Sequence, residues 1–217
     1  MIASKIIDRA GLLLSDTEGR RWPRETLLDF VNEGIRQVVL VRPDAAARVE
    51  VVQLSPGTRQ SLPADGLRLL DVIRNMGPDG ASPGPAVRLS EKAALDAADA
   101  GWHGAAPGSQ ADEYLYDLRR PGVFYVSPPV GASADLFVEI AYAASPAPLE
   151  AESQEIELDD VYAGPVLDWV MYRAFHADTE SGAGRARAEH HFEAFYRALD
   201  RKTQSDFAVA PDNGSNT

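Results

Sequence analysis

The chain has 217 residues, no cysteine and a formal net charge of −12. Without cysteine there can be no disulfide, no thiol catalysis and no cysteine-ligated metal site. The acidic excess argues against sequence-independent binding of nucleic acid, because such binding needs clustered Lys and Arg. No apolar run approaches the roughly 20 residues of a membrane span, and the start of the chain lacks the apolar stretch of a signal peptide. These features predict a globular protein made in the cytosol.

The first 47 residues predict two helices. Apolar residues at three- and four-residue steps mark residues 4–14 as the first. The second begins at Pro23, which suits the first helical position because its missing N–H costs nothing there. Arg42-Pro43-Asp44 ends it, since the residue before a proline disfavours the helical region. The buried stripe predicted for this second helix comprises Leu27, Leu28, Val31, Ile35, Val38 and Val39.

Residues 48–150 predict a β-rich region of about five to seven short strands. The strands are expected at residues 48–54, 58–62, 67–76, 87–89, 114–118, 123–127 and 136–142. Arg119-Arg120-Pro121-Gly122 has the composition of a hairpin turn. The stretch 77–85, rich in Gly, Pro, Asp and Ser, predicts a loop, and residues 91–100 predict a short helix.

The remaining chain returns to helical periodicity. One helix is expected from about Asp159 to Phe175, because acidic residues favour the positive end of a helix dipole, and another over residues 186–202. Ile156 and Leu158 are expected to extend along the surface. The fold class is therefore α+β: residues 1–47 and 155–203 form a helical bundle of two helix pairs, residues 48–150 are the β-rich insertion, and residues 204–217 are a flexible tail.

Candidate chemical sites are sparse. The four histidines are His103, His176, His190 and His191; the last two are adjacent and point about 100° apart on a helix, so they cannot easily bind one metal together. Six carboxylates lie between residues 150 and 160, but their spacing is not that of a calcium loop, which favours a solvated acidic strand. No nucleophile, phosphate-binding or dinucleotide motif is present. We predict no catalytic residue, no cofactor and no metal site.

The opening and closing segments resemble a known family. The opening pattern is Trp22-Pro23, Glu25, Leu27-Leu28, Val31-Asn32-Glu33-Gly34, Arg36-Gln37-Val38-Val39 and Arg42-Pro43-Asp44-Ala45. The closing pattern is Tyr162 through Trp169, Tyr172-Arg173-Ala174, and Ala188 through Phe195-Tyr196. Both are similar to the head–tail adaptor (connector) proteins of tailed phages. The resemblance covers about residues 1–50 and 155–203.

The resemblance implies a structural virion protein at the neck of the particle, not an enzyme. Such adaptors form a homo-oligomeric ring of about twelve copies, with the portal protein above and a tail or nozzle protein below. DNA passes through the ring without specific binding, and no membrane is involved. The helices build the wall, the β region faces the tail, and the C-terminal tail docks into the portal. The docking segment would be the apolar patch Ser205, Asp206, Phe207, Ala208 and Val209, which could equally pack back on its own domain.

Two other functions remain open from the sequence. A tail-tube or tail-completion protein would share the acidic charge and the β content, but its copy number in the particle would differ. A cytosolic metal-dependent hydrolase would need His176 and Glu193 to converge with further ligands in a pocket. The acidic surface has two interpretations: it aids solubility, or it suits a channel through which DNA slides, because it repels phosphate.

Overall fold

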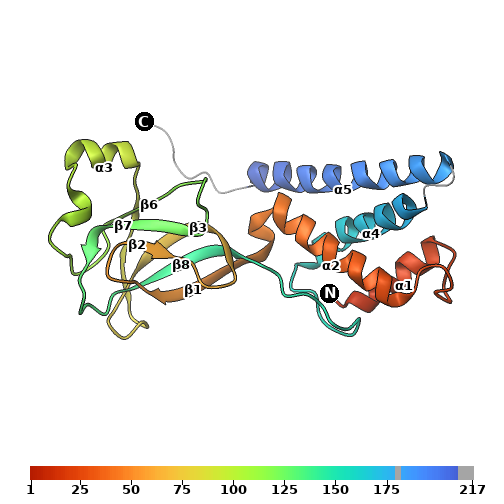
Figure 1. Ribbon diagram of the computed structural model, residues 1–217, viewed down its shortest axis with the longest axis horizontal. Helices are drawn as coiled ribbons and strands as arrows, with labels where there is room; N and C mark the ends of the chain where they lie inside the picture. The colour runs from red at the N-terminus through yellow and green to blue at the C-terminus, as the bar shows by residue number, and fades with distance from the viewer. Residues whose placement is uncertain (179–181, 210–217) are drawn as a thin grey trace. The chain divides into compact units, whose positions relative to one another are not determined.

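A computed structural model describes residues 1–178 and 182–209 (Figure 1). The described chain is mixed α+β, with five α-helices and two four-stranded sheets, and the predicted α+β class is confirmed. It divides into two compact units, Met1–Ala45 with Pro146–Thr217, and Ala46–Ser145. We call them the helical unit and the β unit.

The helical unit contains α1 (Ala3–Leu13), α2 (Arg24–Val41), α4 (Ala163–Ala177) and α5 (Gly182–Val209). Helix α4 contacts each of the other three. All six residues of the stripe predicted for α2 are buried. Pro23, however, lies just before the helix in an extended conformation, with φ −53° and ψ 143°, so it is not the first helical residue.

Helices α2 and α4 approach closely at Gly34. A Cβ atom at this position would lie 3.2 Å from Cβ of Trp169, which is nearer than side chains normally pack. The Trp169 ring also meets Phe195 of α5 at 5.2 Å between ring centroids, with the rings steeply inclined. A glycine on one helix thus lets a tryptophan side chain link three helices.

The segment 146–158 is held against α1 and α2 within the helical unit. Asn32 donates to the carbonyl of Leu149 at 3.0 Å and accepts from its N–H at 2.8 Å. The N–H of Ile156 donates to the carbonyl of Met1. Ile156 and Leu158 are buried, so the expectation that they extend along the surface was wrong. Burying these two side chains removes apolar area from water.

Helix α4 follows a short 3₁₀ turn, η3 (Asp160–Tyr162), and Asp159 caps this turn by accepting from the N–H of Val161 at 2.9 Å. Helix α5 runs on to Val209, past the predicted end at residue 202. Residues 204–209, which were predicted to belong to a flexible tail, are therefore helical. The rest of that predicted tail, residues 210–217, lies outside the described residues.

The β unit contains eight strands in its described residues, one more than the upper expectation. They are β1 (Ala47–Gln53), β2 (Gly57–Ser61), β3 (Gly66–Met76), β4 (Pro83–Ala86), β5 (Arg88–Leu89), β6 (Glu113–Tyr116), β7 (Val123–Val130) and β8 (Phe137–Ala144). One sheet has the order β1-β8-β3-β4 and the other β2-β7-β6-β5. Helix α3 (Lys92–Ala98) and the 3₁₀ turns η1 (Pro43–Ala46) and η2 (Trp102–Gly104) complete the elements.

The β core draws alternate residues from both sheets. Val138, Ile140 and Tyr142 of β8 are fully buried, as are Phe124 and Val126 of β7. Alternation follows from the period of two along a strand. The predicted hairpin is confirmed, because β6 and β7 pair antiparallel across the predicted turn.

Strand β4 lies where a loop was expected. Local composition at Pro83-Gly84-Pro85 favours a turn, but the segment pairs antiparallel with β3. The buried side chain of Asn75 on β3 donates to the carbonyl of Pro85 at 3.1 Å, which helps to hold β4 in place. Tertiary contacts therefore override local propensity here.

Candidate interaction surfaces

The predicted docking segment begins beside a buried cation. Arg42, at the end of α2, is buried. Its guanidinium donates to both Asp44 carboxylate oxygens at 2.9 and 2.6 Å, to Oγ1 of Thr203 at 2.8 Å and to Oδ2 of Asp206 at 2.8 Å. Lys202 also donates to Asp206, at 3.1 Å. We call these five residues the Arg42 cluster.

Hydrogen bonds within the Arg42 cluster favour the ionised form of its two carboxylates. The hydrogen bond from Arg42 lowers the pKa of Asp44. Hydrogen bonds from Arg42 and then Lys202 lower the pKa of Asp206. Charge-assisted bonds of this kind are stronger than neutral ones. These bonds connect the end of α2 to residues 203 and 206 of α5.

The Arg42 cluster includes one of the predicted docking residues, which are Ser205, Asp206, Phe207, Ala208 and Val209. Their backbones form the last turns of α5. The side chain of Asp206 packs back on its own unit through the Arg42 cluster. The side chains of the other four lie outside the described structure, so their role remains a prediction.

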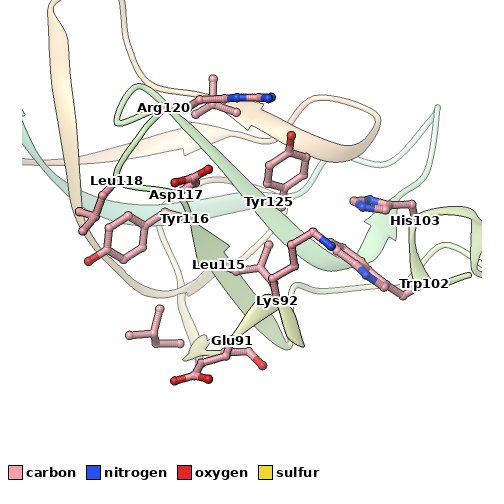
Figure 2. A pocket seen from close by; sticks show the side chains of 13 residues that line it. Glu91, Lys92, Trp102, His103, Leu115, Tyr116, Asp117, Leu118, Arg120 and Tyr125 are labelled. Atoms are coloured by element: carbon pink, nitrogen blue, oxygen red, sulfur yellow. The ribbon is translucent and has the colours of Figure 1, made fainter. Parts of the chain in front are cut away.

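The β unit carries a second surface, an apolar groove of about 500 Å³ (Figure 2). Leu115 of β6 and Tyr125 of β7, which pair across the sheet, form part of its lining. Leu89 and Leu118 also line it, and both are highly exposed, at 61% and 63% of their surface. Isolated exposed apolar side chains are common on protein surfaces. Several of them gathered in one groove indicate a binding surface.

One wall of the groove is aromatic and held by hydrogen bonds. The rings of Trp102 and His103 stack at 3.7 Å. Nε1 of Trp102 donates to Asp96 at 3.0 Å, and Nδ1 of His103 lies 2.8 Å from Oγ1 of Thr58. Figure 2 shows Tyr125 between this wall and the rest of the groove. A preorganised wall loses little side-chain freedom when it binds a partner.

The sequence analysis considered His103 only as one of four histidines. It did not find the groove, because Leu89 and Leu118 come from separate elements. The signal that could have found them is their apolar character at positions expected to face solvent. Arg120, at the predicted hairpin turn, is exposed and reaches the rim of the groove (Figure 2).

The histidines and the glutamate considered as metal ligands contact different partners and do not converge. His191 pairs with Asp168 through Nδ1 at 2.9 Å, and His190 is exposed. His176 packs on the ring of Tyr172, whereas Glu193 pairs with Arg197 one turn along α5. Across residues 1–178 and 182–209 there is no group of three or more His, Asp or Glu side chains placed to hold a metal ion.

The acidic stretch 150–160 is partly neutralised. Glu152 accepts from Nε of Arg24 at 2.6 Å, and Asp160 pairs with the N-terminal amine of Met1 at 3.1 Å. Asp159 caps η3. These carboxylates therefore stabilise local contacts of the helical unit.

The model of the SU10 adaptor protein family matches residues 1–214, which is nearly the whole sequence. The chain belongs to the SU10 adaptor protein family. This membership confirms the resemblance to phage adaptor proteins and extends it over the middle of the chain, which the sequence patterns did not match. Among curated proteins, none matches the sequence significantly.

Membership in a phage adaptor family identifies a structural component of a virion. Within the described part of the chain, no helix combines the length and apolar character needed to cross a membrane.

Proposed function

We propose that this chain is the head-to-tail adaptor of a tailed phage and forms a ring between portal and tail through which DNA passes. The observation that carries the proposal is the family match over residues 1–214. The acidic charge of −12 supports it, because an acidic channel repels DNA and lets it slide without sticking.

A ring closed by rotation requires two different, complementary faces on each subunit. The helical unit offers apolar side chains for such contacts: Leu12, Leu13, Leu40 and Val161 are all more than half exposed. In the proposed ring of about twelve copies, this unit is a helical bundle that builds the wall. The β unit, with its apolar groove, faces the tail or nozzle protein.

The end of α5 is the proposed portal contact, with Ser205, Asp206, Phe207, Ala208 and Val209 as its residues. Because Asp206 is already bonded to Arg42, we expect the Arg42 cluster to orient the helix end for docking. The test is deletion of residues 207–217, which leaves the cluster intact. We expect an unchanged melting temperature and weaker binding to purified portal. Unchanged binding would refute the docking role.

The ring itself is tested by copy number in purified particles. Quantitative mass spectrometry should find about one adaptor chain per portal subunit. A large excess over portal would instead indicate a tail-tube protein, and absence from the particle would overturn the virion role. Cryo-electron microscopy of the neck then shows whether the chain lies between portal and tail or completes the tail further down.

A further inference from the structure

The two sheets of the β unit have four edges, and three of them are blocked. Strand β4 contains Pro83 and Pro85, which have no N–H to donate. Strand β5 is only two residues long. Strand β2 has only five residues and starts at a glycine, and its pairing with β7 shifts register between Gly57 and Arg59. Prolines, shortness and irregular register are the means by which proteins prevent edge strands from pairing with other chains.

Strand β1 has none of these protections. It pairs with β8 in unbroken register over seven residues, Ala47–Gln53, and contains neither proline nor glycine. Val49 and Val51 are 58% and 40% exposed. A regular edge strand with exposed β-branched side chains is a template for a further strand.

The direction of the free backbone groups follows from the ladder. Just past β1, the N–H of Leu54 donates to the carbonyl of Leu136 at 2.8 Å, continuing the β1–β8 register. In an antiparallel pair, residues that exchange hydrogen bonds alternate with residues that do not. Even-numbered residues of β1 therefore bond to β8, whereas Val49 and Val51 direct their N–H and C=O groups to the open edge. Outside the strand ladders, neither residue has a backbone hydrogen-bond partner among the described residues.

The side chains beside this edge suit an apolar strand. Val51 lies near Phe137 of β8, because a Cβ atom at Gly80 would contact both side chains, at 3.8 and 3.6 Å. Val49 and Val51 project to the same face as each other, since side chains alternate along a strand. On the opposite face the exposed Glu50 adds a negative charge. An added strand with β-branched residues facing the valines and a Lys or Arg near Glu50 would complement both faces.

We propose that β1 is the acceptor for an extended strand of another protein in the particle, added antiparallel or parallel to Ala47–Gln53. The inference rests on the proposed ring. Copies related by rotation contact one another through two different surfaces, and the other three edges of this chain are blocked. Pairing of β1 with β1 of a second copy would instead make a two-fold dimer. We therefore assign the added strand to a different protein.

Hydrogen exchange tests the proposal on the wild-type chain, free and in purified particles. In the free chain, the amides of Val49 and Val51 should exchange much faster than those of Glu50 and Val52, which face β8. In particles, exchange of the Val49 and Val51 amides should slow by at least about tenfold. If the chain is present at portal stoichiometry and these amides remain fast, strand addition is wrong while the adaptor ring stands. If the chain is absent from particles, both proposals are overturned.

Two variants distinguish loss of strand addition at β1 from loss of folding. Val51→Pro removes an outward N–H without touching the bonds to β8, and Val51→Thr is the matched control that keeps this N–H. We expect both free chains to melt cooperatively, and Val51→Pro alone to lower the yield of tailed particles by roughly tenfold, the effect of losing about 1.4 kcal/mol of binding. Equal yields would overturn the proposal. If Val51→Pro does not fold, the wild-type exchange data decide.

A single introduced cysteine identifies the partner, because the chain has no other. In Val49→Cys particles, a short bifunctional thiol-to-amine reagent should join this position to a different protein. Cross-links that join two copies of this chain through β1 would overturn the assignment to another protein.

Discussion

Asn75 provides the sharpest test of how the β unit is held together. Its side chain is 5% exposed. Nδ2 donates to the carbonyls of Pro85 at 3.1 Å and Ala111 at 2.7 Å, and Oδ1 accepts from the N–H of Ala111 at 2.8 Å. One amide therefore joins β3 to β4 and to the segment before β6. The perturbation we consider is Asn75→Asp, which preserves shape and removes both donated bonds.

The expected loss can be worked from these contacts. The buried carbonyl of Ala111 loses its donor, at about 1–3 kcal/mol. The carbonyl of the more exposed Pro85 loses its donor at a smaller cost, and a charged oxygen now faces both. Breaking a buried polar arrangement so that a charge is left without a partner costs about 3–5 kcal/mol. We expect Asn75→Asp to lower the free energy of unfolding by about 4 kcal/mol at pH 7, which is a shift of roughly 1.5–2 M in the urea midpoint.

The loss should depend on pH with a definite sign. Burial raises the pKa of the introduced carboxyl above its unfolded value of about 3.9. The folded state then binds the proton more tightly, and the protonated group can donate one hydrogen bond. The loss in the free energy of unfolding should therefore become smaller as pH falls from 7 to 5. The assay is urea unfolding followed by circular dichroism at both pH values.

The control is Gln204→Glu, which adds the same charge at an exposed position of α5 and should change stability by less than about 0.5 kcal/mol. A loss below about 1 kcal/mol at pH 7 for Asn75→Asp, or a loss that is the same at both pH values, would show that the Asn75 amide does not hold these segments together.

Three further predictions concern other parts of the chain. Phe195→Ala should lower the free energy of unfolding by about 3–5 kcal/mol, because this fully buried ring packs between α4 and α5; urea unfolding measures it. The N–H groups of Ser82 and Ala81, followed by the hydroxyl of Ser82, lower the pKa of Asp79 to about 2. The stabilisation of its loop should therefore be present above the unfolded pKa of about 3.9 and be lost as pH falls through 2. In an NMR titration, Ser82→Ala should raise this pKa, and an unchanged value would contradict the assignment. Asp206→Asn should speed hydrogen exchange at the end of α5 while leaving α2 protected, because only the charge-assisted bonds to Arg42 and Lys202 weaken; exchange that stays at the wild-type rate would show that Asp206 does not hold the helix end.

Much of the secondary structure is readable from the sequence because its cause is local. The stripe Leu27 to Val39 predicts α2 through helical periodicity alone, and it is buried as predicted. The hairpin at Arg119–Gly122 follows from turn chemistry between two apolar runs. The family was recognisable from the helical ends of the chain, where these local patterns are strongest, and the family model covers the variable middle as well.

The elements that the sequence misplaced depend on distant residues. Strand β4 has the composition of a loop and is a strand because β3 and Asn75 supply its partners. Helix α5 continues past residue 202 into a segment with tail-like composition, where Arg42, far away in sequence, pairs with Asp206. In both places a contact between residues remote in the chain outweighs the local preference.

Composition and short-range spacing were enough to establish the acidic charge, the absence of thiol chemistry, the positions of most helices and strands, and the resemblance to phage adaptors. The surfaces that can meet a partner became visible only in the folded chain. The groove joins residues of separate elements, and β1 is an open edge only because β8 pairs with one side of it and no described strand pairs with the other. Such surfaces are products of packing, since each arises where residues far apart in the sequence come together or where a neighbour is missing.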